Sequence, residues 1–253
     1  MNSFFSGTPY SPANAQTSPQ GRSAASFSDL VQRIVQSNSG KQRAVKPANE
    51  VVQDGRLWED CRLLAEEALS NHNYDRAEAL LLKAVARAEE LPVRDWRRVY
   101  GLETLLSLYY SQNRFEEAEV FADRYSSYVQ AVYGVDHFKT GDALNFLASI
   151  YFSLGKYDKA IENASKALSI YKHGQFPDRS KLAMVLNNLA VINHQFGDFI
   201  SSESFFKSAY NLRCELFGED HPSTQKVVDS YNEMVCDRES HEAAKKIINR
   251  LLD

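Results

Sequence analysis

The chain has 253 residues, of which 43% are hydrophobic and 25% are charged, and these are ordinary values for a soluble globular protein. Its net charge of -4 and its pI near 5.9 argue against a nucleic-acid-binding protein, because such domains usually have a pI above about 9. No stretch of about 18 apolar residues is present, so we also expect no membrane span.

The cysteines and the first residues indicate a cellular compartment. The chain has three cysteines, an odd number, and no two of them stand at CxxC spacing: Cys61, Cys214 and Cys236. They therefore predict neither a disulfide framework nor a zinc site. Each falls at a helical position that looks buried, where a thiol behaves as a small hydrophobe. The N-terminus lacks the positive and apolar regions of a signal peptide. We therefore expect a cytoplasmic protein.

Residues 1–50 are rich in Ser, Asn, Gln, Ala and Pro, a composition that predicts a disordered tail. Within it, the segment 27–36 has apolar residues at helical spacing: Phe27, Leu30, Val31, Ile34 and Val35. Three interpretations stay open for this short amphipathic helix. It folds back on the protein as a lid, it binds a separate partner, or its spacing is accidental.

From Leu57 onward the apolar period is helical, and short polar turns divide the helices into pairs. The predicted helices are 57–71 with 75–90, 98–112 with 116–133, 140–154 with 158–173, and 180–196 with 200–217. Each pair is a helix hairpin. The hairpins predict four repeats over 57–90, 98–133, 140–173 and 180–217, inside a folded domain that spans 54–253.

The hairpins share a sequence pattern. Near the start of each second helix stands an aromatic residue, and these residues are 41, 42 and 42 positions apart: Tyr74, Phe115, Tyr157 and Phe199. Three residues later comes a small side chain, which lets the second helix lie close to the first: Ala77, Ala118, Ala160 and Ser202. Self-similarity at a fixed period predicts stacked structural units.

A degenerate fifth unit is expected over 222–252, with helices at about 222–236 and 240–252. His241 stands 42 residues after Phe199, and Ala244 takes the place of the small residue. A solenoid end needs a polar outer face, which the last helix can supply through Lys245, Lys246, Asn249 and Arg250. We expect this unit to cap the stack.

Several short motifs carry a resemblance to a known family. Leu186-Asn187-Asn188-Leu189-Ala190 is echoed by Leu144-Asn145-Phe146-Leu147-Ala148, and the turn Gly134-Val135-Asp136-His137 is echoed by Gly218-Glu219-Asp220-His221. Over residues 57–252 the chain resembles the tetratricopeptide repeat (TPR), in the 42-residue variety of kinesin light chains. The resemblance implies an all-α, right-handed superhelix of about five hairpins.

In that family the first helices line a concave wall. Carried onto this sequence, the resemblance implies a wall of Glu59, Arg62, Glu66, Leu69, Tyr100, Glu103, Ser107, Tyr110, Asp142, Asn145, Ser149, Phe152, Met184, Asn187, Val191, His194 and Gln195. The expected peptide-binding groove consists of Arg62, Tyr100, Glu103, Tyr110, Asp142, Asn145, Phe152, Met184, Asn187 and His194.

The composition of this wall suits the capture of a peptide. The amides of Asn145 and Asn187 can pair with the backbone of an extended segment, or they can simply be solvated. Apolar pockets would come from four residues: Tyr100, Tyr110, Phe152 and Met184. The alternative role of the three aromatic residues is packing between repeats. Four carboxylates favour a partner with some basic residues: Glu59, Glu66, Glu103 and Asp142.

One well-known function of the family is disfavoured. Cochaperones that grip a C-terminal carboxylate use Lys and Arg at matched groove positions, which here are occupied by Glu59, Glu103, Asp142 and Met184. Only Arg62 is basic. A chaperone-tail clamp is therefore not expected.

No motif of catalysis is present. The chain lacks a P-loop, a Gly-rich dinucleotide turn, HExxH and GxSxG, and its six histidines do not stand at metal-ligand spacing. His137 and His221 fall in turns between repeats, where bonds to the local backbone are expected. We therefore expect no enzyme, no cofactor and no metal.

Three functional hypotheses remain. The first is a noncatalytic adaptor or scaffold that binds a peptide segment of a partner protein in the groove. The second is a ligand- or peptide-responsive sensor that controls a protein partner, and its shape would change on binding. The third is self-assembly through the N-terminal edge, near Leu57, Trp58 and Leu64. We expect a monomer or a weak homodimer.

Overall fold

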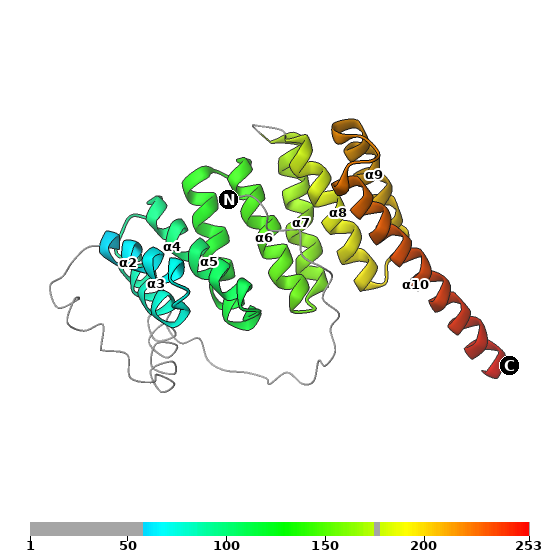
Figure 1. Ribbon diagram of the computed structural model, residues 1–253, viewed down its shortest axis with the longest axis horizontal. Coiled ribbons are helices and arrows are strands. Elements are labelled where there is room, and N and C mark those ends of the chain that lie inside the picture. The colour runs from blue at the N-terminus through cyan, green and yellow to red at the C-terminus, as the bar shows by residue number, and fades with distance from the viewer. Residues whose placement is uncertain (1–57, 175–177, 253) are drawn as a thin grey trace. The chain divides into compact units, whose positions relative to one another are not determined.

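The computed structural model describes residues 58–174 and 178–252, and in this part nine α-helices follow one another without a strand (Figure 1). The helices are α2 (Trp58–Ser70), α3 (Tyr74–Ala88), α4 (Trp96–Ser111), α5 (Phe115–Tyr133), α6 (Phe138–Ser153), α7 (Tyr157–His173), α8 (Arg179–Phe196), α9 (Phe199–Phe217) and α10 (Pro222–Leu252). The predicted tail 1–50, with its segment 27–36, lies outside the described residues. The all-α solenoid fold predicted from the repeat is confirmed.

Helices α2 to α9 form four antiparallel hairpins, each in contact with the next. The second helix of one hairpin packs on the first helix of the following one, as α3 does on α4, α5 on α6 and α7 on α8. All eight helices begin and end within two residues of the predicted bounds. Such a stack depends on contacts between neighbours, as is typical of repeat proteins.

Small side chains hold the two helices of each hairpin close together. Ala77, Ala118 and Ala160 are fully buried, and Ser202 occupies the same position in the fourth hairpin. The Ser202 hydroxyl donates a hydrogen bond of 2.8 Å to the Ala190 carbonyl of α8, so the polar group is satisfied at this close contact. A larger side chain would have no space there, because the interior is packed to high density.

The turn inside each hairpin has one recurring geometry. One residue in each turn has a positive φ: His72, Asn113, Gly155 and Gly197. The next residue donates its N–H to a carbonyl near the end of the first helix, as Lys156 does to Tyr151 at 2.9 Å. Glycine adopts this backbone without steric cost, whereas His and Asn do so less easily.

The turns between hairpins also confirm a prediction. The Nδ1 atoms of His137 and His221 accept the backbone N–H groups of Lys139 and Ser223, each at 3.2 Å. Both histidines therefore cap the start of a helix and bond the local backbone. Their role in this part of the chain is structural.

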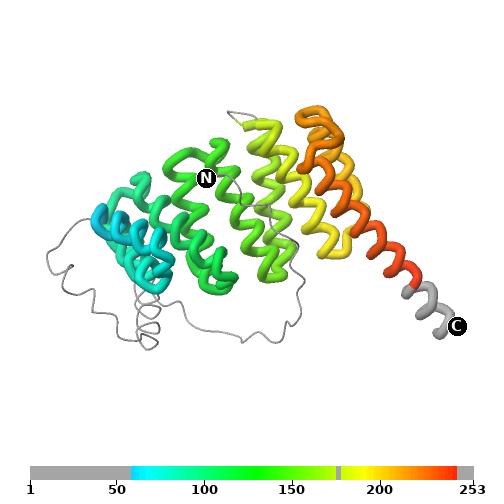
Figure 2. The backbone as a smooth tube through the Cα atoms, in the orientation of Figure 1, coloured from blue at the N-terminus to red at the C-terminus, as the bar shows by residue number. Residues whose placement is uncertain are grey.

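The predicted fifth hairpin is wrong, because residues 222–252 form the single helix α10 (Figure 1), and the coloured part of this helix is one uninterrupted coil in Figure 2. By the repeat period, Glu239 stands where Gly155 and Gly197 adopt a positive φ in earlier turns. Glutamate is a good helix former and disfavours that backbone conformation. The helix therefore continues through the expected turn. The side chains at 244–252, on which the predicted polar cap depends, lie outside the described part.

The buried alanines lead to a test of the packing. Ala160→Leu should lower the free energy of unfolding by about 1–3 kcal/mol, because the extra atoms push α7 away from α6. Ser165→Leu, at an exposed position of the same helix, is the matched control and should change it by less than about 0.5 kcal/mol. Urea denaturation measures both. Equal effects at the two positions would contradict close packing at Ala160.

A second test concerns the start of α9, where Asp198 is the N-cap and its Oδ1 accepts the Ser201 N–H at 3.0 Å. Hydrogen bonds from the Ser201 side chain and backbone hold the pKa of Asp198 below its ordinary value. Asp198→Ala should cost about 1 kcal/mol of stability at pH 7, and Asp198→Asn much less, because asparagine also caps helices well.

The pH dependence of this effect has a definite sign. A depressed carboxyl pKa contributes stability above the pKa of the unfolded chain, and the contribution is lost as the pH falls through the folded pKa. The deficit of Asp198→Ala relative to wild type should therefore shrink in acid. Thermal unfolding at several pH values measures it, and a deficit that grows in acid would contradict the assignment.

Candidate functional site

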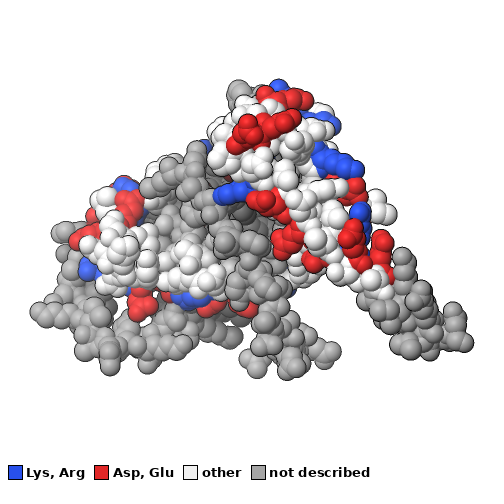
Figure 3. All heavy atoms as spheres, turned by 45° about the vertical axis from the view of Figure 1, so that its right-hand side comes forward, with Lys and Arg blue, Asp and Glu red and all other residues white. Residues whose placement is uncertain are grey.

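The predicted wall residues lie on α2, α4, α6 and α8, the first helices of the four hairpins, and we call this set the first-helix face. The partly or fully exposed members of the predicted groove are Arg62, Tyr100, Glu103, Tyr110, Asp142, Phe152, Met184 and Asn187. On the side of the molecule drawn in Figure 3, basic and acidic side chains lie interspersed over the described surface.

Arg62 is engaged by its own helix. Its guanidinium forms ion pairs with Glu59 at 2.7 Å and with Glu66 at 2.6 Å. The Tyr100 hydroxyl of α4 donates a hydrogen bond to Glu66, and this bond together with Arg62 lowers the pKa of the Glu66 carboxyl. The two carboxylates therefore neutralise the one basic residue of the predicted groove.

Two tryptophans extend this end of the face, and the sequence analysis did not assign them to it. The Trp58 and Trp96 rings lie 5.8 Å and 6.1 Å from the Tyr100 ring, edge to face, and 5.3 Å from each other. Trp58 is buried, whereas Trp96 is half exposed. The sequence could have assigned Trp96 to the face, because Trp96 stands four residues before Tyr100 on the same side of one helix.

Glu103 is the one carboxylate among the four predicted on this face that has no ion pair with a described residue. Its side chain is exposed, yet surrounding protein raises its pKa. Burial is the main cause, Asp142 adds repulsion, and Lys139 partly offsets both.

Asp142 of α6 is held by two partners from neighbouring helices. Its carboxylate accepts the Tyr171 hydroxyl of α7 at 2.6 Å and pairs with the Lys181 ammonium of α8 at 2.6 Å. Gly141 makes room for this contact, since a Cβ there would lie 2.9 Å from the Tyr171 ring. Burial and the hydrogen bond to Asp142 raise the pKa of Tyr171.

The two asparagines of the predicted groove differ. Asn145 is only 4% exposed, and its Oδ1 accepts the Nδ2 of Asn188 on α8 at 2.9 Å, so its amide joins two hairpins. Asn187 is half-buried, and its Oδ1 has no donor among the described residues. The interpretation of Asn145 as a solvated or peptide-holding residue does not fit its buried position.

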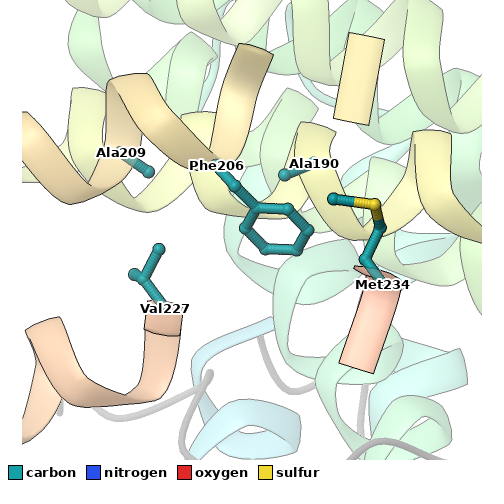
Figure 4. Packing of buried hydrophobic residues seen from close by; sticks show 5 residues of the cluster. All are labelled: Ala190, Phe206, Ala209, Val227 and Met234. Carbon is teal, nitrogen blue, oxygen red and sulfur yellow. The ribbon is translucent and has the colours of Figure 1, made fainter. Parts of the chain in front are cut away.

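His194 is also buried, and α10 covers it. Its Nε2 lies 2.9 Å from Asp237 Oδ2, and its ring centroid lies 5.9 Å from that of Phe199. Beside this contact, α10 packs on α8 and α9 through Val227 and Met234 against a cluster with Phe206, Ala190 and Ala209 (Figure 4). The role of His194 in the described structure is to hold α10.

The remaining aromatic wall residues contact their neighbours as well as solvent. The Tyr110 ring lies 5.6 Å from Phe146 of the next hairpin, and the Phe152 ring lies 5.9 Å from Tyr157. Both rings are half-buried. Tyr110 therefore packs between two hairpins and Phe152 packs within its own hairpin, while both rings remain partly exposed.

A polar network joins α3 and its C-cap to the following hairpin, and sequence reasoning missed it. Glu78 is buried and accepts bonds from Arg114 at 2.6 Å and from the Tyr109 hydroxyl at 3.0 Å. Glu89 pairs with the buried Arg98 at 3.2 Å. These partners are 9 to 36 residues apart in the chain, so no local motif could indicate them.

Three expectations about other sites can be compared with the described residues. These residues contain no group of His, Cys, Asp and Glu side chains suited to a metal ion. Across the same residues, no helix is both long and apolar enough to cross a membrane. Cys61 is buried as expected and burial raises its pKa, but the prediction is wrong for Cys236, which is exposed.

Exchanging each asparagine for alanine tests their different roles. Asn145→Ala should lower the free energy of unfolding by about 1–3 kcal/mol, because Asn188 loses a buried acceptor. Asn187→Ala, at the same repeat position, should cost less than about 0.5 kcal/mol, since its Oδ1 receives no hydrogen bond. Chemical denaturation of both variants measures the difference. Equal losses would contradict the assigned hydrogen bond.

The comparisons with known proteins agree with the repeat. Residues 107–173 and 182–223 match two models of the tetratricopeptide repeat. Among curated protein sequences, none matches the chain. A solved chain assigned as a kinesin light chain of Podosopora anserina, with nearly identical TPR-like repeats, has a TM-score of 0.61 at 15% identity, covering 76% of this chain and 91% of its own.

A second solved structure, BtubC (BKLC) from P. vanneervenii, has a TM-score of 0.57 at 21% identity. The match covers 77% of this chain and 74% of that one. At these identities the likeness concerns the fold. It confirms the predicted resemblance to kinesin-light-chain-like repeats.

Proposed function

We propose that this chain, a tetratricopeptide-repeat protein of the kinesin-light-chain-like type, is a noncatalytic adaptor. It binds a peptide segment of a partner protein on the first-helix face. Tetratricopeptide repeats are generally protein–protein interaction modules and are typically noncatalytic. The three free thiols suit a reducing compartment, and we place the protein in the cytoplasm.

One observation carries the proposal. In three successive hairpins, the first helix carries aromatic, apolar and polar side chains that are partly or fully exposed. These side chains are Tyr100, Glu103, Tyr110, Phe152, Met184 and Asn187. Half-buried aromatic rings are rigid and lose little conformational entropy on binding. We leave Asn145 and His194 out of the contact set, because they are buried and hydrogen-bonded to the neighbouring helices α8 and α10.

Position-specific photo-crosslinking tests this assignment. A benzoylphenylalanine at Ser107 of α4 stands between Glu103 and Tyr110 on the face, and one at Ser169 of α7 stands on an exposed position of a second helix. In native extract, the full chain with the probe at Ser107 should crosslink to a discrete partner protein. The probe at Ser169 should give at least about tenfold less of the same product.

The pattern of products decides the outcome. Equal crosslinking from both positions would mean that the partner does not prefer the first helices. A partner captured from Ser169 alone would contradict the proposal and move the binding surface to the second helices. Equal thermal unfolding of the two labelled proteins is the control for folding.

A further inference from the structure

One kind of charged group recurs between the hairpins. In each case a carboxylate holds a cation, and the cation also lies close to an aromatic ring. The five groups are Glu66 with Arg62 and Tyr100, Glu78 with Arg114 and Tyr109, Glu89 with Arg98 and Tyr128, Glu119 with Lys159 and Tyr151, and Asp142 with Lys181 and Phe138.

The distances in these groups are those of direct contacts. The Arg114 guanidinium is 2.6 Å from Glu78 and its central carbon is 4.6 Å from the Tyr109 ring centroid. The Lys181 ammonium is 2.6 Å from Asp142 and 5.0 Å from the Phe138 ring centroid. A cation in such a place gains both a charge-assisted hydrogen bond and the attraction of the ring face.

Glu103 has the carboxylate of such a group but no bound cation within the described structure. Tyr100 stands one turn before it on α4, but the ring of Tyr100 already belongs to the group of Glu66 and Arg62. Lys139 acts on Glu103 from a distance, and its ammonium lies 5.1 Å from the Tyr133 ring centroid.

The other carboxylates predicted on this face already have an ion-pair partner. Glu59 and Glu66 share Arg62, and Asp142 holds Lys181. A basic side chain that approaches the face therefore finds one carboxylate without an ion pair.

We propose that the bound segment supplies the missing cation, a lysine or arginine side chain that pairs with Glu103. This inference rests on the proposed function and names the chemistry of its ligand. The preferred ligand is a peptide with one basic residue at a defined position. Asp142 and Glu66 contribute little to this preference, since each already has a cation.

Selection from a random peptide library tests the proposal without knowledge of the partner. Three forms of the full chain serve as bait: wild type, Glu103→Gln and Glu103→Lys. The matched control is Glu59→Gln, because Glu59 is an exposed carboxylate of the same face that already pairs with Arg62. Wild type and Glu59→Gln should both enrich Lys or Arg at one position. Peptides selected on Glu103→Gln should show no enrichment of Lys or Arg at this position. Peptides selected on Glu103→Lys should be enriched in Asp or Glu there instead.

Binding of one selected peptide gives the magnitude. Its Kd should rise about tenfold in Glu103→Gln, which is about 1.4 kcal/mol, and change less than about twofold in Glu59→Gln. Glu103 is exposed, so Glu103→Gln should unfold at the temperature of wild type. The unfolding temperature separates a lost contact from a lost fold.

The outcomes distinguish this inference from the proposed function. Enriched peptides without a basic preference, or with a preference that Glu103→Gln leaves unchanged, would overturn the inference and keep peptide binding. Failure of wild type to enrich any peptide would overturn both. Reversal of the preferred charge by Glu103→Lys would establish the direct contact.

Discussion

The close approach of two helices at one small residue is the constraint on which the rest of the structure depends. Ala77, Ala118 and Ala160 are fully buried where the helices of a hairpin meet, and Ser202 meets the same requirement by giving its hydroxyl to a carbonyl of α8. Because this contact recurs every 41 or 42 residues, the hairpins have the same geometry and stack in register. The stack in turn aligns α2, α4, α6 and α8 as one face.

Charged and polar side chains join the hairpins beside the apolar core. Glu78 with Arg114, Asp142 with Lys181, and Asn145 with Asn188 each bridge successive units. Such groups tolerate burial only when they are paired, so they restrict how neighbouring units can meet. What remains for binding is the set of side chains that this network does not use, and Glu103 belongs to it.

The sequence predicted the hairpins well because their signal is periodic and local. Helix bounds agree within two residues, and the small residues stand where the helices touch. The long helix α10 was not predicted, because the repeat period alone does not reveal that Glu239 cannot easily turn the chain. The failure is physical: a period predicts where a turn is needed, and the residue decides whether it forms.

The candidate site was less predictable, since equal positions in the repeat have different surroundings. Asn145 and Asn187 occupy the same repeat position, yet Asn145 is buried against Asn188 and Asn187 remains half-buried without a donor. His194 was placed on the wall, but α10 covers it through Asp237. Whether a wall side chain is available to a ligand depends on hydrogen-bond partners about 43 residues away in the chain. A local sequence pattern does not contain these partners.

Hydrogen exchange of the full chain, with and without a saturating selected peptide, tests the central claim most directly. If the first-helix face binds the ligand, exchange should slow in α4, α6 and α8 and stay unchanged in α5 and α7, which lie behind them in each hairpin. Slower exchange confined to α3, α5 and α7 would contradict the account, because it would place the ligand on the opposite side of the hairpins.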